Sequence, residues 1–403
     1  MARLEPSQIP DEPHFLGEFG PIVYRRSALI GGVALAVSFG LGLILRDLDR
    51  FCHAYLVNYC YFLSLSLGAL FFVVLQHLAR AGWSVVVRRL AEILAANLPL
   101  MAVLALPVLF GTGVLYDWVH ASESAHAELI EAKRAYLNLP FFLVRIGAYF
   151  AIWTWLSRVL LNRSVEQDAS GDVDITLRLT RFSGLAVVLF ALTITFAAFD
   201  LIMSLTPQWF STIFGVYYFA GSMVGFVAVI TLVAMLLQAR GLLARAITIE
   251  HYHDLGKLLF AFVFFWGYIA FSQYMLIWYA NIPEETGWYL VRQSGSWLWV
   301  SLVLLFGHFL LPFLGLLPRR VKRRKPTLAF WAVWALVMHW VDLYWLIMPT
   351  HSPERLPLGL LEIGCFLGLG GLFLAGLVRA AGRSALIPVN DPRLAESLEF
   401  ENA

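Results

Sequence analysis

The chain has 403 residues, of which 60% are hydrophobic and only 14% charged, and its mean hydropathy is +0.73. This balance excludes an ordinary water-soluble globular domain, and a net charge of +2 is too small to favour nucleic-acid binding. The three cysteines, Cys52, Cys60 and Cys365, form no CxxC or CxxCH pattern. We therefore expect no iron–sulfur cluster, no covalently bound haem and no metal ligand set in this chain.

Ten apolar stretches of roughly 20 residues follow one another along the chain, which is the length that an α-helix needs to cross the hydrocarbon core of a bilayer. They predict an all-α integral membrane protein with ten transmembrane helices. The expected spans are Ser27–Leu45, Tyr55–Gln76, Ile93–Leu115, Leu139–Leu161, Phe182–Met203, Ile213–Leu237, Leu255–Ala280, Trp297–Leu317, Thr327–Met348 and Leu358–Val378. The transmembrane domain then covers residues 27–378, between an N-terminal tail of residues 1–26 and a C-terminal tail of residues 379–403.

Lysine and arginine set the expected orientation. An even number of spans places both tails on one side, and that side collects 20 of the 29 basic residues, against 6 on the opposite side and 3 within spans. Basic residues accumulate in cytoplasmic loops. We therefore expect both tails to be cytoplasmic.

Six polar residues lie near the outer ends of spans two to five. They are Asn58, Tyr61, Asp117, His120, Arg145 and Asp200. Ionisable groups in a bilayer are costly and usually face a bundle interior or a wet cavity. If these four spans form a bundle, the six residues line one outward-opening pocket, which suits a polar head group and the protons it releases. The alternative is a structural ion pair of Arg145 with Asp117 or Asp200.

The second half carries a different set of polar residues, which we interpret as candidates for a proton path. They are His308, His339, Asp342 and Glu362, with His253, Asp254 and Lys257 at the cytoplasmic start of span seven. Asp342 follows His339 by three residues and shares its helix face. For the cytoplasmic group, the alternative is an ordinary solvated helix start in which Asp254 complements the helix N-terminus. The matched depth of His308 and His339 also admits a b-type haem held by two imidazoles.

Two segments resemble a known family. AFDLIMSLTPQWFSTIFGVYYFAGS (Ala198–Ser222) and HDLGKLLFAFVFFWGYIAFSQYMLIWYANIPEET (His253–Thr286) are similar to ActF, a membrane component of bacterial alternative complex III, which is a quinol:electron acceptor oxidoreductase of the inner membrane. The likeness extends over essentially all ten spans. ActF resembles ActC, its sister in the same complex, and both look like membrane anchors of the NrfD/polysulfide-reductase type.

The resemblance implies two four-helix bundles, spans two to five and spans six to nine, with spans one and ten peripheral. It implies no bound metal in this chain, with haems and iron–sulfur clusters carried by partner proteins on the periplasmic side. An aspartate before a P-x-W-x-[ST]-T-I-F stretch belongs to the quinol site of ActC, and its match here is Asp200, ahead of Pro207 and Trp209. The other quinone-contacting histidine and aspartate have no clear match, and His120 lies in an outer loop.

The expected function is therefore that of an integral subunit of a respiratory quinol:cytochrome c (electron acceptor) oxidoreductase. Menaquinol or ubiquinol would be oxidised near the periplasmic face, either here or in the sister protein ActC, with this chain also a candidate for proton conduction. Catalysis by this chain alone is not expected. Two alternatives stay open. One is a stand-alone secondary transporter, in which Pro99, Pro107 and Pro207 would interrupt helices at a substrate site. The other is a purely structural scaffold within the complex.

Overall fold

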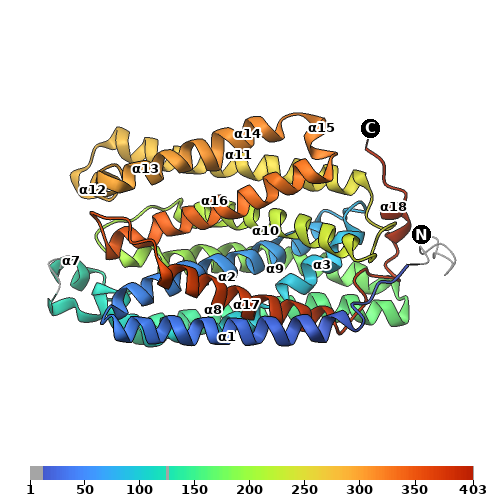
Figure 1. Ribbon diagram of the computed structural model, residues 1–403, viewed down its shortest axis with the longest axis horizontal. Helices are drawn as coiled ribbons and strands as arrows, with labels where there is room; N and C mark the ends of the chain where they lie inside the picture. Colours follow the sequence, from blue (N-terminus) through green and yellow to red (C-terminus); the bar gives the residue numbers. More distant parts are fainter. Residues whose placement is uncertain (1–11, 124–126, 403) are drawn as a thin grey trace.

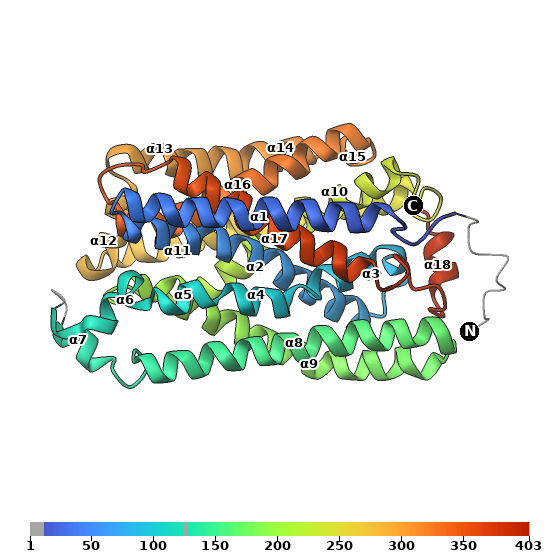
Figure 2. The same cartoon turned by 60° about the horizontal axis from the view of Figure 1, so that its bottom comes forward.

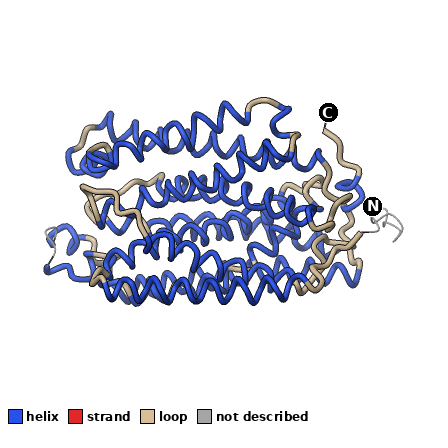
Figure 3. Tube along the Cα trace, viewed as in Figure 1, coloured by secondary structure: helices blue, strands red, loops and turns tan. Residues whose placement is uncertain are grey.

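The computed structural model describes residues 12–123 and 127–402, and within these ranges it contains helices and no strands. Ten helical spans are long and apolar enough to cross a membrane, which confirms the all-α membrane fold. They run side by side along the long axis of the molecule, and loops gather at its two ends (Figures 1 and 3). The start of α1 and the C-terminal α18 lie at one end, called here the termini end, and α7 (Ala127–Ala132) and α12 (Pro283–Arg292) lie at the other, the far end.

Seven of the ten spans are single helices of 22 to 32 residues. These are α1 (Phe19–Ile44), α2 (Leu48–Leu78), α8 (Leu139–Ser170), α10 (Phe214–Ala239), α11 (Ile249–Ala280), α16 (Lys325–His351) and α17 (Leu360–Ala381). The fifth span is α9 (Val173–Leu201) followed by the short η3 (Met203–Leu205). The third span is divided into α3 (Val85–Ala95), α4 (Leu98–Leu104) and α5 (Leu106–Phe110), with the short α6 (Thr112–Leu115) directly after it, and the eighth into α13 (Gly295–Val303), the π-helical η4 (Leu304–Leu310) and α14 (Leu311–Leu316). The short helices η2 (Asp117–Glu123), α15 (Arg319–Lys322) and α18 (Leu394–Leu398) lie outside the spans, as do α7 and α12.

The spans pack as two groups of four with a separate pair. In the first group, α2 packs against α3 and α9, and α8 packs against α9 and α4. In the second, α10 packs against α11 and α16, and the α13–α14 span contacts α11 and α16. The pair α1 and α17 lies against α2 (Figure 2). This arrangement agrees with the expected bundles of spans two to five and six to nine with peripheral spans one and ten.

Helix α2 lies at the centre of the molecule, because it contacts both groups and the peripheral pair. In its most apolar stretch 94% of the residues are buried, compared with 22% in α1. The two groups meet where α2 passes α10, and a Cβ added at Gly68 of α2 would lie 2.6 Å from the backbone oxygen of Ser222. Only glycine allows this close approach.

The third span is irregular because it contains proline. Pro99 and Pro107 each stand within the first two positions of a short helical piece, where the missing N–H costs nothing, but each ends the regular hydrogen bonding before it. In a bilayer the freed carbonyls need other donors. Where α4 ends, Tyr55 of α2 supplies such a donor, because its hydroxyl donates to the carbonyl of Leu104, the last residue of α4, at 2.8 Å.

The peripheral helices α1 and α17 meet through small residues. A Cβ added at Gly31 would lie 2.7 Å from the backbone nitrogen of Leu372 and 2.8 Å from the backbone oxygen of Gly368. A Cβ at Gly371 would lie 2.7 Å from the backbone oxygen of Ser27. Small residues let the two backbones touch, which is how helices commonly associate in lipid.

The C-terminal segment, residues 382–402, folds back over the termini end instead of trailing away from it. The hydroxyl of Ser397 donates to the carbonyl of Trp83 at 2.7 Å, and Asp391 forms a buried ion pair with Arg88. At the other terminus, α1 begins at Phe19, so the expected N-terminal tail is already helical over its last eight residues. Residues 1–11 of that tail lie outside the described residues, as does residue 403.

Candidate functional site

The first candidate site is an ion pair at the far end of the first bundle. Asp200, near the end of α9, accepts two hydrogen bonds of 2.8 Å from Nε and Nη2 of Arg145 on α8. The side chain of Asp200 is completely buried and that of Arg145 is 9% exposed. The structure therefore contains the ion pair of Arg145 with Asp200, which is one of the two pairings that the sequence left open. Such parallel bonds give this pair its fixed geometry.

Two tyrosines complete this pair. The hydroxyl of Tyr149 donates to Oδ2 of Asp200 at 2.8 Å, and the guanidinium of Arg145 lies 3.8 Å from the ring centre of Tyr136 while donating to its carbonyl. Sequence reasoning missed both tyrosines. Tyr149 follows Arg145 by four residues and so shares its helix face, a spacing that could have indicated it. We call Arg145, Asp200 and Tyr149 the first-bundle cluster.

The other four pocket candidates lie elsewhere. Asp117 and His120 are exposed on the short helix η2, and the hydrogen bonds of Arg145 go to Asp200 and Tyr136 instead. Asn58 and Tyr61 of α2 are buried but face the second bundle and α17: the Tyr61 ring lies 5.4 Å from that of His339 on α16. The six expected residues therefore do not form one pocket, because depth along a helix does not determine the direction in which a side chain points.

Asn58 belongs to a second polar group at the far end, between α2, α16 and α17. Its amide donates to the carbonyl of Glu362 at 3.2 Å and its oxygen accepts from Trp340 at 2.8 Å. The Glu362 carboxylate, expected on a proton path, is held by two 2.9 Å hydrogen bonds from Arg50 and also accepts from the backbone of Gly359 at the start of α17. Glu362 thus caps α17 and ties it to α2.

The centre of the second bundle holds a buried carboxylate. Asp342 of α16 accepts hydrogen bonds from the hydroxyl of Tyr217 on α10 at 2.5 Å and from Nε1 of Trp266 on α11 at 3.1 Å. No basic side chain forms an ion pair with Asp342 among the described residues. Its two donors are both uncharged, so Asp342 differs from Asp200 in having no compensating charge.

The two expected histidines lie beside Asp342. His339 is one helical turn away, and its Nε2 lies 2.8 Å from the hydroxyl of Ser64 on α2. His308, in the π-helical turn η4, is fully buried, stacks on Trp266 with ring centres 3.9 Å apart, and has no hydrogen-bond partner at either nitrogen among the described residues. The His339 ring lies 2.8 Å from the position that a Cβ would occupy at Gly225, and Trp266 stacks on the ring of His308. This packing does not fit a haem between the two imidazoles.

The expected cytoplasmic group lies at the termini end, at the start of α11. Asp254 and Lys257 form an ion pair, and Nζ of Lys257 also donates to Asn402 of the C-terminal segment at 2.8 Å. His253 is buried, with no partner described for its Nδ1. Among the described side chains, no chain of direct hydrogen bonds joins this group to Asp342. The proton-path role of these residues stays a prediction.

Sequence reasoning also missed Arg292 of α12, which is 2% exposed. Its guanidinium donates to the carbonyls of Trp288, Trp345 and Leu346 at 2.8 to 3.2 Å, and it lies 3.4 Å from the ring centre of Trp288. Burial lowers the pKa of Arg292 to about 9, so it stays protonated at neutral pH. Three carbonyls and an aromatic face replace the carboxylate that a buried arginine usually has.

Two large cavities lie between the spans, and neither is lined by Asp200. One, of about 880 Å³, lies between α11 and the α13–η4 span; its wall is largely aromatic and includes Tyr217 and Trp266, the two donors to Asp342. The other, of about 1050 Å³, lies between α1, α4, α8 and α17, and its wall includes Arg158, Arg379 and Arg383. The first cavity therefore borders the two side chains that donate hydrogen bonds to Asp342.

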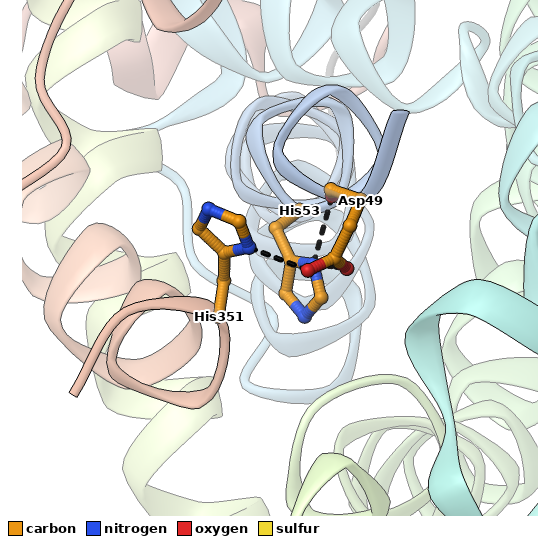
Figure 4. Close-up of side chains that lie close together, drawn as sticks. All are labelled: Asp49, His53 and His351. Atoms are coloured by element: carbon orange, nitrogen blue, oxygen red, sulfur yellow. Dashed lines mark hydrogen bonds and ion pairs between the residues drawn. The ribbon is translucent and has the colours of Figure 1, made fainter. Parts of the chain in front are cut away.

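One group among the described residues has the spacing of metal ligands: Asp49 and His53 of α2 with His351 of α16 (Figure 4). Their ligand atoms all lie within 4.8 Å of one another. The sequence predicts no metal site and does not single out this group. Asp49 and His53 are four residues apart, but His351 lies about 300 residues further along the chain, so no local motif reveals it.

No family model and no curated protein matches this chain. The fold and its membrane-spanning character therefore rest on the structure, and the family stays an expectation from the two segments quoted above.

Proposed function

We propose that this chain is a membrane subunit of a respiratory quinol oxidoreductase, similar to ActF of alternative complex III, in the inner membrane of a bacterium. The far end would then face the periplasm and the termini the cytoplasm. Support comes from the excess of basic residues at the termini end and from the two-bundle fold that the resemblance implies. Haem and iron–sulfur proteins, together with the NrfD-like sister ActC, would be its partners.

The observation that carries the proposal is the first-bundle cluster. Oxidation of a quinol releases two electrons and two protons, so a quinol site needs a group that accepts protons near the outer surface. Asp200 is a buried carboxylate at that end, and Tyr149 donates to it through a hydroxyl that can pass a proton on. Arg145 orients the carboxylate and supplies its counter-charge. The electrons would leave to the haems of partner proteins.

A second candidate is a structural scaffold, because every oxygen of Asp200 already has a hydrogen-bond donor. In that case quinol would be oxidised in ActC, and the pair would only hold α8 to α9. The two candidate functions predict different effects of removing the Asp200 charge. A quinol site loses turnover in an assembled complex, whereas a scaffold does not.

The test is quinol oxidation by the purified complex carrying Asp200→Asn. We expect at least a tenfold loss of activity with unchanged haem content, and partial recovery in Asp200→Glu. Tyr149→Phe keeps the ion pair and is expected to slow turnover as well. Asp174→Asn, at the exposed other end of the same helix, serves as the control. If an assembled complex with Asp200→Asn keeps full activity, the quinol-site proposal is refuted and the structural scaffold is the remaining function.

A further inference from the structure

The group at the far end is built by two helices from different bundles. Asp49 and His53 lie one turn apart in the first two turns of α2, and His351 is the last residue of α16 (Figure 4). Nδ1 of His53 lies 3.0 Å from Oδ1 of Asp49 and also 3.0 Å from the backbone carbonyl of Asp49, and Nδ1 of His351 lies 2.6 Å from Oδ2. Both imidazoles therefore turn the same nitrogen toward one carboxylate, and their ring centres are 5.4 Å apart.

This donor set matches the chemistry of a borderline transition metal. Zn²⁺ is bound by imidazole nitrogen and carboxylate oxygen at about 2.0–2.2 Å, so in a tetrahedral site the ligand atoms stand about 3.3 Å apart. The separations in this group, between 2.6 Å and 4.8 Å, bracket that value. Small side-chain rotations would therefore bring the three atoms around one ion. Two imidazoles and a carboxylate exclude a site built for Ca²⁺ or Mg²⁺, which prefer oxygen alone.

The group is also reachable and held in place. The side chain of Asp49 is 48% exposed, whereas those of His351 and His53 are 15% and 5% exposed. An ion could thus arrive from solvent at the carboxylate and meet two imidazoles fixed by packing, with its fourth position left to water. The neighbouring cation, Arg50, is paired with Glu362 and bonded to the carbonyl of Pro357, so its charge is largely compensated.

We propose that Asp49, His53 and His351 form a binding site for a divalent transition-metal ion of the Zn²⁺ class. The ion joins α2 of the first bundle to α16 of the second at the far end, and so fixes the spacing of the two bundles there. The site is separate from the first-bundle cluster and does not depend on the proposed quinol chemistry.

The test is Zn²⁺ binding by the full chain in detergent or nanodiscs after treatment with a chelator, measured by calorimetry and by the thermal unfolding temperature. We expect one ion per chain and a higher unfolding temperature when Zn²⁺ is bound. Asp49→Asn and His351→Gln are each expected to weaken binding at least about tenfold. His120→Gln, which removes an exposed histidine at the same end of the molecule, is the control and should bind as the parent does.

A ligand exchange separates loss of a ligand from loss of the fold. His351→Cys keeps a metal ligand of softer character, so it should retain binding and shift the preference toward Cd²⁺. Co²⁺ bound to this variant should show a thiolate charge-transfer band that the parent lacks. The proposal fails if the parent chain binds no Zn²⁺, or if Asp49→Asn and His351→Gln bind it as tightly as the parent.

Discussion

Replacing Asp200 by asparagine should destabilise the folded chain by about 3–5 kcal/mol, because it leaves the charge of Arg145 buried without its partner. The magnitude follows from the contacts: the carboxylate accepts two charged hydrogen bonds from Arg145 and one from Tyr149. An asparagine has a single acceptor oxygen, so at least one bond worth about 1.5–3 kcal/mol is lost, and the buried guanidinium loses its counter-charge. Arg145→Gln should cost a similar amount for the converse reason.

The double variant Arg145→Gln, Asp200→Asn distinguishes a true pair from two independent losses. Its cost should fall short of the sum of the single costs by about 1–3 kcal/mol, because neither charge is then left alone. Equilibrium unfolding in mixed micelles, followed by tryptophan fluorescence, measures all four forms, with Asp174→Asn as the exposed control on α9. Strictly additive costs, or a loss below about 1 kcal/mol for Asp200→Asn, would show that the pair does not stabilise the bundle.

Three further predictions concern packing. Gly31→Leu should lower the unfolding temperature by forcing α1 away from α17, whereas Gly32→Leu, where an added Cβ meets nothing within 4 Å, should leave it unchanged; equal effects would contradict the proposed contact. Arg292→Lys should cost about 2–4 kcal/mol in unfolding free energy, since an ammonium cannot reach three carbonyls while lying flat on a tryptophan ring; a neutral result would refute this account. Asp391→Asn should speed amide hydrogen exchange in residues 384–402, and unchanged exchange, or an equal effect of the exposed Glu399→Gln, would argue against a docked segment.

Hydropathy predicted which parts of the chain cross the membrane, but not where each helix stops. The expected fourth span ends at Leu161, whereas α8 continues to Ser170, because its last turns are polar and lie beyond the apolar stretch. Likewise Arg88 and Arg89, counted among loop charges, lie in the first turn or two of α3, buried against Glu92. A polar helix end has no hydropathy signal, so it reads as a loop.

The sequence predicted how deep in the membrane each candidate side chain lies, but not the direction in which it points. The Arg145–Asp200 pair was one of the two structural alternatives, and His339 and Asp342 share a helix face as expected. Asn58 points away from the first-bundle cluster. The sequence could not indicate this direction, because α2 is buried on all sides and therefore has no single hydrophobic face that would show its rotation. The donors to Asp342 come from α10 and α11, and only tertiary packing brings them together.

The ties between the two bundles have a consequence for motion. At the termini end the C-terminal segment bonds to α8, where Asn390 donates to the carbonyl of Asp168 at 2.6 Å, and to α11, where the carbonyl of Ser397 lies 3.0 Å from Nε2 of His251. At the opposite end His351 reaches across to Asp49. A transporter that alternates its access must swing one half against the other. Such a movement would have to break these contacts at both ends of the molecule and to shift α2, which packs against both bundles.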